Sequence, residues 1–468
     1  MLAPHVQSRR LVPVAAGVCL FLAALSSHAQ LAGEVEFARG VGFAQTPGQN
    51  PRTLGKGMEL REGDRLTTAD GASAIIKMAD GTRMTVRPNS ELVLQQYQFK
   101  ENAPDNSMLM QLVRGGFRAV TGLISKSSPN AARVQTNTAT IGIRGTDFDA
   151  RLCAKDCGTE SAKVSETSRP NAVQASAKVL QAQGEVNAVD GAGQRRRLVD
   201  GGSIYPGDMV ETGAGTRAVL VFRDDSRMTL GSATRFRIDN FVYDEKNAGE
   251  GRFLVSLLRG SVRALTGLIA KANNRNVGFS TATATIGIRG SGADMSCTGA
   301  CAGEPGGADS GLSVFTWLGS FTVTPAGPGG QPGQTAMQVL QAGQGLLITP
   351  SGIRPIPSAP PVEGPRPDQL NVPQGTVDKL FASNNVADTE EGLFVFVRDG
   401  HIEIASKNEV LHLGKGEAGF ANNNGNTARP NTIPKFIEFD KLPLPTSKNP
   451  LLVSVLADSG IKTSNQCK

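Results

Sequence analysis

The string "NTATIGIRGTDF" occupies residues 137–148, and "ATATIGIRGSGA" occupies residues 282–293, about 145 positions later. Each string places an arginine between two glycines and is rich in Thr and Ile, which favour pleated strands. A string written twice is either a duplicated binding site or a duplicated piece of scaffold. The flanking sequence distinguishes these two interpretations.

The sequence before each string is duplicated as well. "EGDRLTTADGASAIIKMADGTRMTVRPNSEL" at 62–92 matches "PGDMVETGAGTRAVLVFRDDSRMTLGSATRF" at 206–236. "LVRGGFRAVTGLISK" at 112–126 likewise matches "LLRGSVRALTGLIAK" at 257–271. The repeat unit therefore spans roughly 120 residues, which is too long for one rung of a solenoid and suits a domain.

The periodicity inside each unit is that of short β-strands. Apolar runs such as "AVLVF" at 218–222 are bounded by turn dipeptides, for example Asp80-Gly81 and Asp224-Asp225. Aromatic residues make up 5% of the chain while 55 of its 468 residues are Gly, a balance that favours thin, turn-rich β architecture. The sequence predicts an all-β fold, with each unit either wound and solenoid-like or sandwich-like.

Three further segments each have the pattern of a strand, a Gly turn and a second strand: "VLQAQGEVNAV" at 179–189, "FTWLGSFTVTP" at 315–325 and "LFVFVRDGHIEIA" at 393–405. They suggest a small β-module after each repeat and a more distant one near the C-terminus. The predicted division is a signal peptide at 1–29, a first domain at 30–157, a linker at 158–178, a second domain at 179–301, a β-module completing it at 302–349, a Pro-rich linker at 350–373, a C-terminal β-module at 374–421 and an unassigned tail at 422–468.

The N-terminus has the features of an export signal. Arg9 and Arg10 precede an apolar stretch at 11–25, and small residues at Ser27 and Ala29 suit cleavage before Gln30. An uncleaved anchor is the alternative, but the apolar stretch is shorter than the roughly 20 residues that a membrane span needs. We expect a periplasmic or secreted protein whose mature chain has no transmembrane segment.

Four motifs occur in the same order in both units: GD-x-[LV]-x-T, D-G-[ST]-x-[ML]-x-[LV], R-G-x-[FV]-R-A-[VL] and I-G-I-R-G-T. The second unit matches the second motif with D-D-S in place of D-G-[ST], and the last as I-G-I-R-G-S. This succession resembles the FecR-type domain, the periplasmic domain of iron-citrate sigma-factor regulators. The resemblance covers roughly residues 32–150 and 180–295. It implies two all-β domains in tandem and a location in the cell envelope.

Regulators of that family place a cytoplasmic anti-sigma segment before one membrane helix, and their C-terminal region meets an outer-membrane receptor. Only about ten residues precede the apolar run here, so the domain type and the envelope location are what carry over. We expect an exported envelope scaffold for binding or signalling, whose partner is another envelope protein of unknown identity. A glycan- or peptidoglycan-binding protein is the alternative, although Trp317 is the only Trp available to stack on a sugar.

The glycine-flanked arginines, Arg144 and Arg289, have two interpretations. As scaffold, each pins a tight strand–turn–strand by bridging carbonyls or a carboxylate. As receptors, they bind an anion together with four matched arginines. The scaffold interpretation is favoured, because acids matched between the copies, Asp64/Asp208 and Asp80/Asp224, offer internal partners. The residues concerned are Gly142, Arg144, Gly145, Gly287, Arg289 and Gly290 for the motif, and Arg114, Arg118, Arg259 and Arg263 for the binding alternative.

No catalytic, cofactor or metal site is predicted. The only histidines after the signal peptide, His401 and His412, lie outside the duplicated units, so a His-activated nucleophile does not explain the duplication. Removing Arg9 and Arg10 lowers the formal net charge from +6 to +4, and the basic residues are scattered. This charge pattern argues against a nucleic-acid partner.

Each repeat is followed by a C-x₃-C pair: Cys153 and Cys157 after the first, Cys297 and Cys301 after the second. In an exported chain this spacing predicts two local disulfides, each on a turn because an extended strand would hold the two cysteines too far apart. A four-thiolate zinc site is the alternative. Cys467 is expected to be free or intermolecular.

Overall fold

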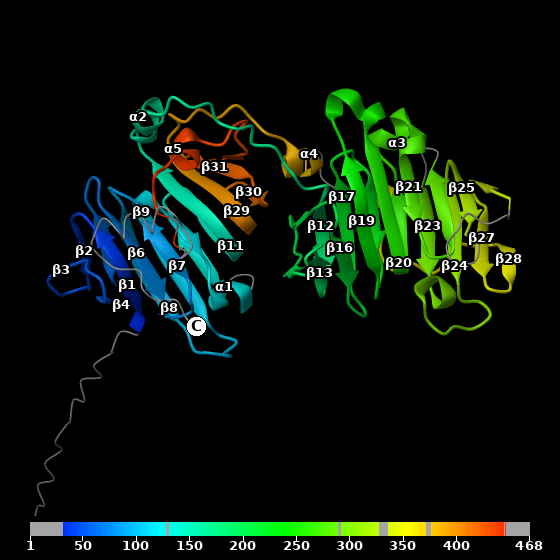
Figure 1. The fold of residues 1–468 in the computed structure, drawn as a ribbon, viewed down its shortest axis with the longest axis horizontal. Helices are drawn as coiled ribbons and strands as arrows, with labels where there is room; N and C mark the ends of the chain where they lie inside the picture. Colours follow the sequence, from blue (N-terminus) through cyan, green and yellow to red (C-terminus); the bar gives the residue numbers. More distant parts are fainter. Residues whose placement is uncertain are drawn as a thin grey trace, which may run out of the picture.

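The computed structural model describes residues 31–127, 131–288, 292–326, 336–370, 376–443 and 445. The predicted signal peptide and Cys467 lie outside these residues. The described chain is mostly β and forms two lobes that lie side by side (Figure 1). Lobe 1 comprises residues 31–162 and 376–443, and lobe 2 comprises residues 177–356. The prediction of an all-β fold is confirmed.

Lobe 1 begins with strands that match the first repeat. Its elements are β1 (Leu31–Arg39), β2 (Gly42–Gln45), β3 (Arg52–Thr53), β4 (Glu59–Arg61), β5 (Arg65–Thr68), β6 (Ser73–Met78), β7 (Arg83–Val86), β8 (Glu91–Gln98), β9 (Ser107–Val120), α1 (Leu123–Ser127), β10 (Ala132–Gln135), β11 (Thr140–Cys153) and α2 (Cys157–Ala162), followed after lobe 2 by α4 (Thr376–Phe381), β29 (Gly392–Ala405), β30 (Val410–Leu413), β31 (Ala418–Asn422), β32 (Thr427–Ala428) and α5 (Lys435–Glu438).

Lobe 2 repeats this order in one continuous stretch. Its elements are β12 (Ala177–Gln183), β13 (Val186–Val189), β14 (Arg195–Arg197), β15 (Ser203–Ile204), β16 (Met209–Thr212), β17 (Arg217–Phe222), β18 (Arg227–Leu230), β19 (Arg235–Val242), η1 (Glu245–Glu250), β20 (Arg252–Leu265), α3 (Leu268–Ala272), η2 (Asn274–Asn276), β21 (Val277–Ser280), β22 (Ala284–Ile288), β23 (Gly292–Cys297), η3 (Gly299–Ala302), β24 (Leu312–Leu318), β25 (Ser320–Pro325), β26 (Gln338–Gln341), β27 (Gly345–Thr349) and β28 (Gly352–Ile356); η5 (Pro367–Gln369) follows it.

Each lobe is a wound sandwich. In lobe 2 one layer runs through β12, β17, β18, β23, β24 and β27, and the other runs through β13, β16, β19, β21, β22 and β25. The long strand β20 bends from the second layer into the first, because its two halves pair with different neighbours. The chain thus alternates between the two layers as it advances along the lobe. The lobe is therefore both wound, as in a solenoid, and two-layered, as in a sandwich.

Each lobe has its own apolar core between its layers, as expected from the alternation of apolar residues along the strands. In lobe 1 the core includes Phe117 and Phe148, whose rings meet edge to face with centroids 5.6 Å apart. It also includes Leu393 and Ile402 of β29, which are fully buried. Residues from the far C-terminal part of the chain are therefore integral to lobe 1.

Lobe 2 is inserted within lobe 1. Strand β29 runs antiparallel along the whole of β11, from Thr140 opposite Ala405 to Cys153 opposite Gly392. It takes the place that β24 and β25 take beside β23 and β22 in lobe 2. The segment at 374–421, separated as a module on its sequence, is thus the last part of the first sheet. The segment at 312–356, in contrast, directly continues lobe 2.

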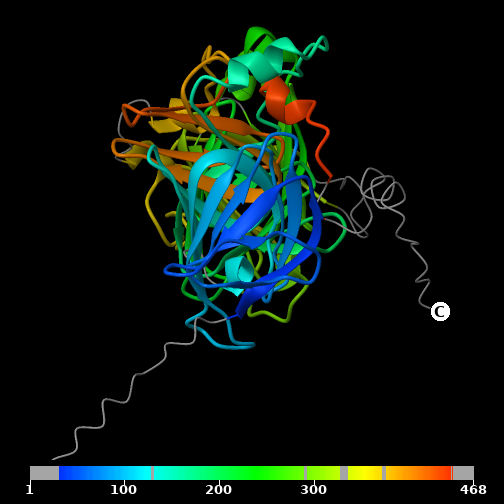
Figure 2. The same ribbon diagram turned by 90° about the vertical axis from the view of Figure 1, so that its left-hand side faces the viewer.

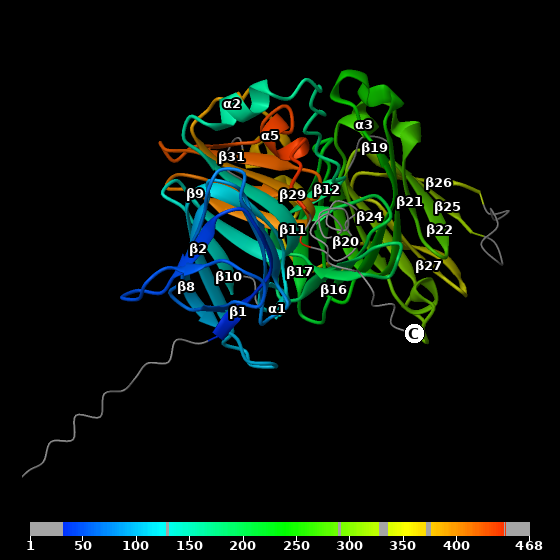
Figure 3. The same cartoon turned by 60° about the vertical axis from the view of Figure 1, so that its left-hand side comes forward.

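The lobes meet end to end. The first strands of lobe 2 face the last strands of lobe 1, with β12 beside β29–β31 in two views of the molecule (Figures 1 and 3). Within the described part of the chain, no helix has the length and apolar character needed to cross a membrane.

Candidate functional site

Arg144, the arginine of the first glycine-flanked string, lies at the junction of the two lobes. Its Nη2 is 3.0 Å from a carboxylate oxygen of Glu403 on the neighbouring strand β29. Both side chains line a cleft of about 600 Å³ whose opposite wall comes from lobe 2, including Arg197 and Asp200. The string therefore faces an interlobe cleft of mixed charge.

The string does not form the tight turn that the sequence suggested. Residues 140–153 are one strand, and the pairing of β11 with β29 shifts between Arg144 and Asp147. Gly145 lies in this bulge with φ of +61°, a backbone conformation that glycine adopts without strain. The bulge allows β11 to pass from one layer to the other. Gly142 is in the regular part of the strand; Gly287 of lobe 2 likewise, while Arg289 and Gly290 lie outside the described residues.

Two histidines, His401 and His412, lie close to Arg144. Nδ1 of His412 is 3.4 Å from Nε2 of His401, which stands opposite Arg144 in the β11–β29 pairing. Burial lowers the pKa of His401 well below its usual value, and the neighbouring His412, Lys178 and Arg144 act in the same direction. Burial also lowers the pKa of His412, although Glu403 opposes the shift. Both rings are therefore neutral at pH 7.

A buried ionic cluster joins the lobes beside this pair. Glu417 of lobe 1 accepts from Lys178 of lobe 2 at 3.0 Å and from Arg429 at 2.9 Å, and none of the three side chains is exposed. Burial alone would raise the pKa of Glu417, but the two cations lower it. Burial lowers the pKa of Lys178 to about 8, which still leaves the amine mostly charged at neutral pH. The carboxylate thus pairs with Arg429 of its own lobe and with Lys178 across the junction, and it fixes how the lobes meet.

Arg118 and Arg263, predicted as alternative binding residues, occupy equivalent positions in the two lobes, where Arg118 is buried and Arg263 is half-buried. In lobe 1 a row crosses three strands, with Thr85 opposite Arg118 and Arg118 opposite Asp149. Arg118 Nε donates to Asp149 at 2.7 Å. Burial alone would lower the pKa of Arg118, but Asp149 and Asp440 raise it, so the guanidinium stays charged.

Lobe 2 has the same row, made of Thr229, Arg263 and Asp294. Arg263 is 3.5 Å from Asp294, which also accepts from the indole of Trp317 at 3.0 Å. Sequence reasoning found the arginines but missed the threonines and aspartates. They could have been found by aligning the two repeats residue by residue, because all three positions are identical in both.

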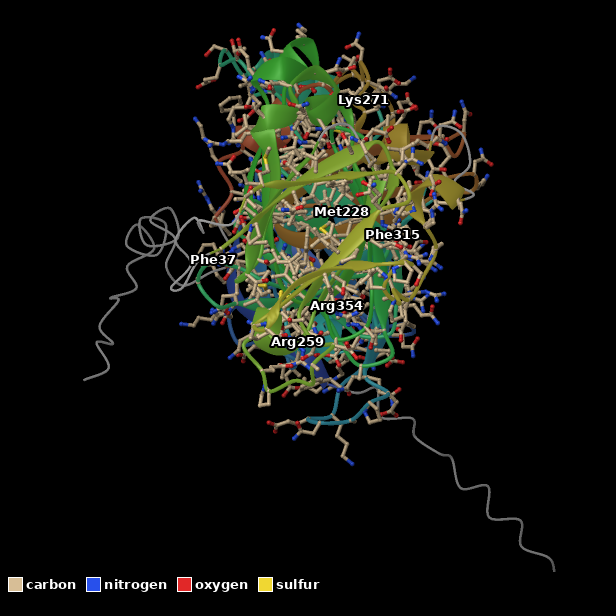
Figure 4. The ribbon with its side chains drawn as sticks, turned by 90° about the vertical axis from the view of Figure 1, so that its right-hand side faces the viewer. Phe37, Met228, Arg259, Lys271, Phe315 and Arg354 are labelled. Carbon is tan, nitrogen blue, oxygen red and sulfur yellow. A yellow bond between two sulfur atoms is a disulfide. The ribbon has the colours of Figure 1, made fainter. Side chains whose placement is uncertain are left out.

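Arg114 and Arg259 do not join these rows. Their side chains are exposed, and they pair with Glu91 at 3.5 Å and with Glu304 at 2.5 Å. Figure 4 views lobe 2 from its free end, where Arg259 is labelled together with Arg354 of β28. The four matched arginines therefore do not form one anion-binding cluster.

The acids matched between the copies have partners other than these arginines. Asp64 pairs with Arg52 at 2.7 Å, and Asp208 pairs with Arg196. Asp80 accepts from the backbone N–H of Thr82 at 3.1 Å, and Asp224 does the same for Ser226 at 3.1 Å. These aspartates organise turns, while the arginines find their own carboxylates at Asp149, Asp294 and Glu403.

Both predicted disulfides are present. Cys153–Cys157 and Cys297–Cys301 have Cα atoms 5.6 and 5.2 Å apart, and each bond joins the end of a strand to a short helix, α2 or η3. The four cysteines are buried. Within the described ranges no three His, Cys, Asp or Glu side chains are grouped to hold a metal ion.

Comparison with known families identifies the repeated units. The FecR protein family model matches residues 64–167 and 208–301. The chain contains two FecR domains in tandem. The two matched regions hold the strands from β5 to β11 and from β16 to β23, so each lobe is built on one FecR domain.

Other similarities are weak. Two crystal structures of a "putative anti-sigma factor" from Parabacteroides distasonis align with 13% identity and a TM-score of 0.24, covering 32% of this chain and 60% of theirs. A likeness at that TM-score supports no conclusion about this FecR protein. Among curated proteins, no sequence matches significantly.

Proposed function

We propose that this tandem FecR protein is exported to the cell envelope and acts there, without catalysis, as a binding or signalling scaffold for another envelope protein. The observation that carries the proposal is the pair of FecR domains, one in each lobe, joined by a buried ionic cluster. A fixed two-lobe body presents its surfaces in a constant arrangement, which suits recognition of a partner protein.

The disulfides support the envelope location. Local disulfides form and persist in oxidising compartments such as the bacterial periplasm, and they are rare in the cytosol. Both FecR domains carry one at the same place, after the last strand of the matched region. The N-terminal segment with its basic and apolar parts supports export to such a compartment.

The proposal is tested by crosslinking in intact cells. The full chain with a C-terminal tag is crosslinked before lysis, purified under denaturing conditions and analysed by mass spectrometry. We expect a small set of envelope proteins enriched over an untagged strain, and a mature N-terminus at Gln30. A chain that starts at Met1 in the cytosol would contradict export. Retention on purified peptidoglycan without any crosslinked protein would favour the glycan alternative.

A further inference from the structure

We propose that the outer face of lobe 1 around Thr85, Arg87 and Arg118 is a groove for an extended peptide segment in which an acidic residue is followed three positions later by proline. Residues 440–443 of this chain, "DKLP", occupy the groove as an internal ligand. This inference names the class of partner and in that respect rests on the proposed scaffold function. The segment follows α5 and runs down the side of lobe 1 (Figure 2).

The groove residues bind the segment through one carboxylate, that of Asp440, and through its backbone. Arg87 Nη1 donates to Asp440 at 2.7 Å, and Arg118 Nη2 lies 3.3 Å from the same carboxylate. Thr85 Oγ1 donates to the carbonyl of Pro443 at 2.9 Å. The three groove residues are at most 5% exposed, although they project from the outer surface of the sheet. They are buried because residues of the segment cover them.

Lobe 2 holds a different segment in the same way. Thr229, the counterpart of Thr85, donates to the carbonyl of Pro365 at 2.8 Å. Arg263, the counterpart of Arg118, donates to the carbonyl of Gly364 at 3.1 Å. The segments "DKLP" and "GPRP" share little beyond proline and enter from unrelated places in the chain. A face that captures unrelated extended segments through equivalent threonine and arginine side chains behaves as a peptide groove.

The groove of lobe 1 differs from that of lobe 2 in requiring an acid. Arg87 follows β7, and the position that follows the matching strand β18 is Gly231. Asp440 is the carboxylate that Arg87 contacts in the described structure, and the second guanidinium nitrogen of Arg87 donates to the carbonyl of Phe436 at 2.7 Å. Burial raises the pKa of Asp440, while Arg87 and Arg118 oppose that shift. Without Asp440 a buried cation would lack its counter-charge, so another acidic segment is favoured in its place.

The internal ligand can leave without unpacking the lobe. Phe436 and Ile437 of α5 are buried in an apolar cluster with Phe394 and Phe420, and this anchor lies before the segment. A cavity of about 300 Å³ beside residues 440–443 is lined by Phe37, Arg39 and Arg151, so the groove has room that the segment does not fill. In lobe 2, by contrast, the segment lies between β28 and α4 and is held at both ends.

The test measures binding of a fluorescein-labelled peptide, EFDKLP, to the full chain by fluorescence anisotropy. We expect the variant Asp440→Ala to bind the peptide at least about tenfold more tightly than the wild type, because its own segment no longer competes with a charge-assisted contact. Adding Arg87→Ala to this variant should remove the gain. Adding Arg114→Ala, an exposed arginine of the same lobe, should preserve it. The peptide EFNKLP should bind about tenfold more weakly than EFDKLP.

Hydrogen exchange on the wild-type chain provides the second measurement, and it decides the matter if Asp440→Ala fails to fold. Excess EFDKLP should accelerate amide exchange of the chain's own residues 440–442, and EFNKLP should not. A folded Asp440→Ala chain that does not bind the peptide, or unchanged exchange in the wild type, would overturn the groove. A partner crosslinked in cells equally well by Arg87→Ala would preserve the scaffold function while refuting this groove as its contact.

Discussion

Lys178 of lobe 2 and Glu417 of lobe 1 form a salt bridge of 3.0 Å in which neither side chain has any exposed surface. Lys178 lies in β12, and Glu417 lies immediately before β31. The contact therefore joins the end of lobe 2 to the end of lobe 1, whose two segments flank lobe 2 in the sequence. Its loss should weaken the coupling between the lobes.

We predict that Lys178→Met lowers the free energy of unfolding by about 3 kcal/mol, because removing one member of a buried pair leaves its partner under-compensated. Arg429 remains beside Glu417 and keeps the cost at the low end of the usual range. Lys379→Met is the matched control, since Lys379 pairs with Glu409 at 2.8 Å but is 66% exposed, and should cost under about 1 kcal/mol. Urea unfolding measures both; equal stability of the two variants would contradict the prediction.

The histidine pair should make the protein less stable in mild acid. The pKa of His401 and that of His412 are lowered in the folded state, while an unfolded histidine titrates near about 6.5. As pH falls below about 6.5 the unfolded chain binds protons that the folded chain excludes, so stability is lost. His401→Gln should reduce this loss. Unfolding free energies at pH 7.5 and 5.5 test it, and identical pH dependence in the variant would count against the pair.

Replacing Arg144 with Ala should lower the stability of lobe 1 modestly and leave partner binding intact. Its ion pair with Glu403 is partly exposed, with side chains 19% and 26% accessible, which limits the expected cost to about 1 kcal/mol. Thermal melts and crosslinking of Arg144→Ala provide the measurements. A normal melt combined with loss of the partner would instead make Arg144 a receptor. The corresponding prediction for Arg289 concerns a residue outside the described part of the chain.

Each disulfide should contribute about 2 kcal/mol in the chain-entropy model, because each closes a loop with a sequence separation of only 4. We predict that Cys153→Ser/Cys157→Ser and Cys297→Ser/Cys301→Ser destabilise the chain by similar amounts. Melting temperatures with and without reductant should differ for the wild type and converge for a chain that carries all four substitutions. Identical melting of the oxidised and reduced wild type would refute this.

The repeated motifs were sufficient to predict the fold class, the two FecR domains and both disulfides. These features can be predicted from short stretches of sequence, because strand alternation and cysteine spacing depend only on residues that are close together in the chain. The pairing of β11 with β29 has no such local signature. The segment at 179–189 was interpreted as the module that follows the first repeat, but it forms β12 and β13 at the start of lobe 2, and the segment at 393–405 completes lobe 1 instead.

The candidate site was predicted only in part for the same reason. Arg118 and Arg263 stood out because the repeats share them, but their surroundings depend on segments far along the chain, Asp440 for one and Gly364 for the other. The partner of Arg144 is equally distant, at Glu403. The spacing of motifs cannot predict contacts between side chains that are far apart in the sequence and meet only in the folded structure.

The insertion of lobe 2 imposes an order on biosynthesis. Lobe 2 is contiguous and can fold as soon as β28 has been made, whereas lobe 1 waits for β29 while β11 presents an unpaired edge. Exposed strand edges invite pairing with other chains, and closure across so long a separation is slow. Lobe 1, whose synthesis begins first, is therefore completed last. Until β29 is made, the unpaired edge of β11 is the place where a chaperone or a co-translocating partner would bind.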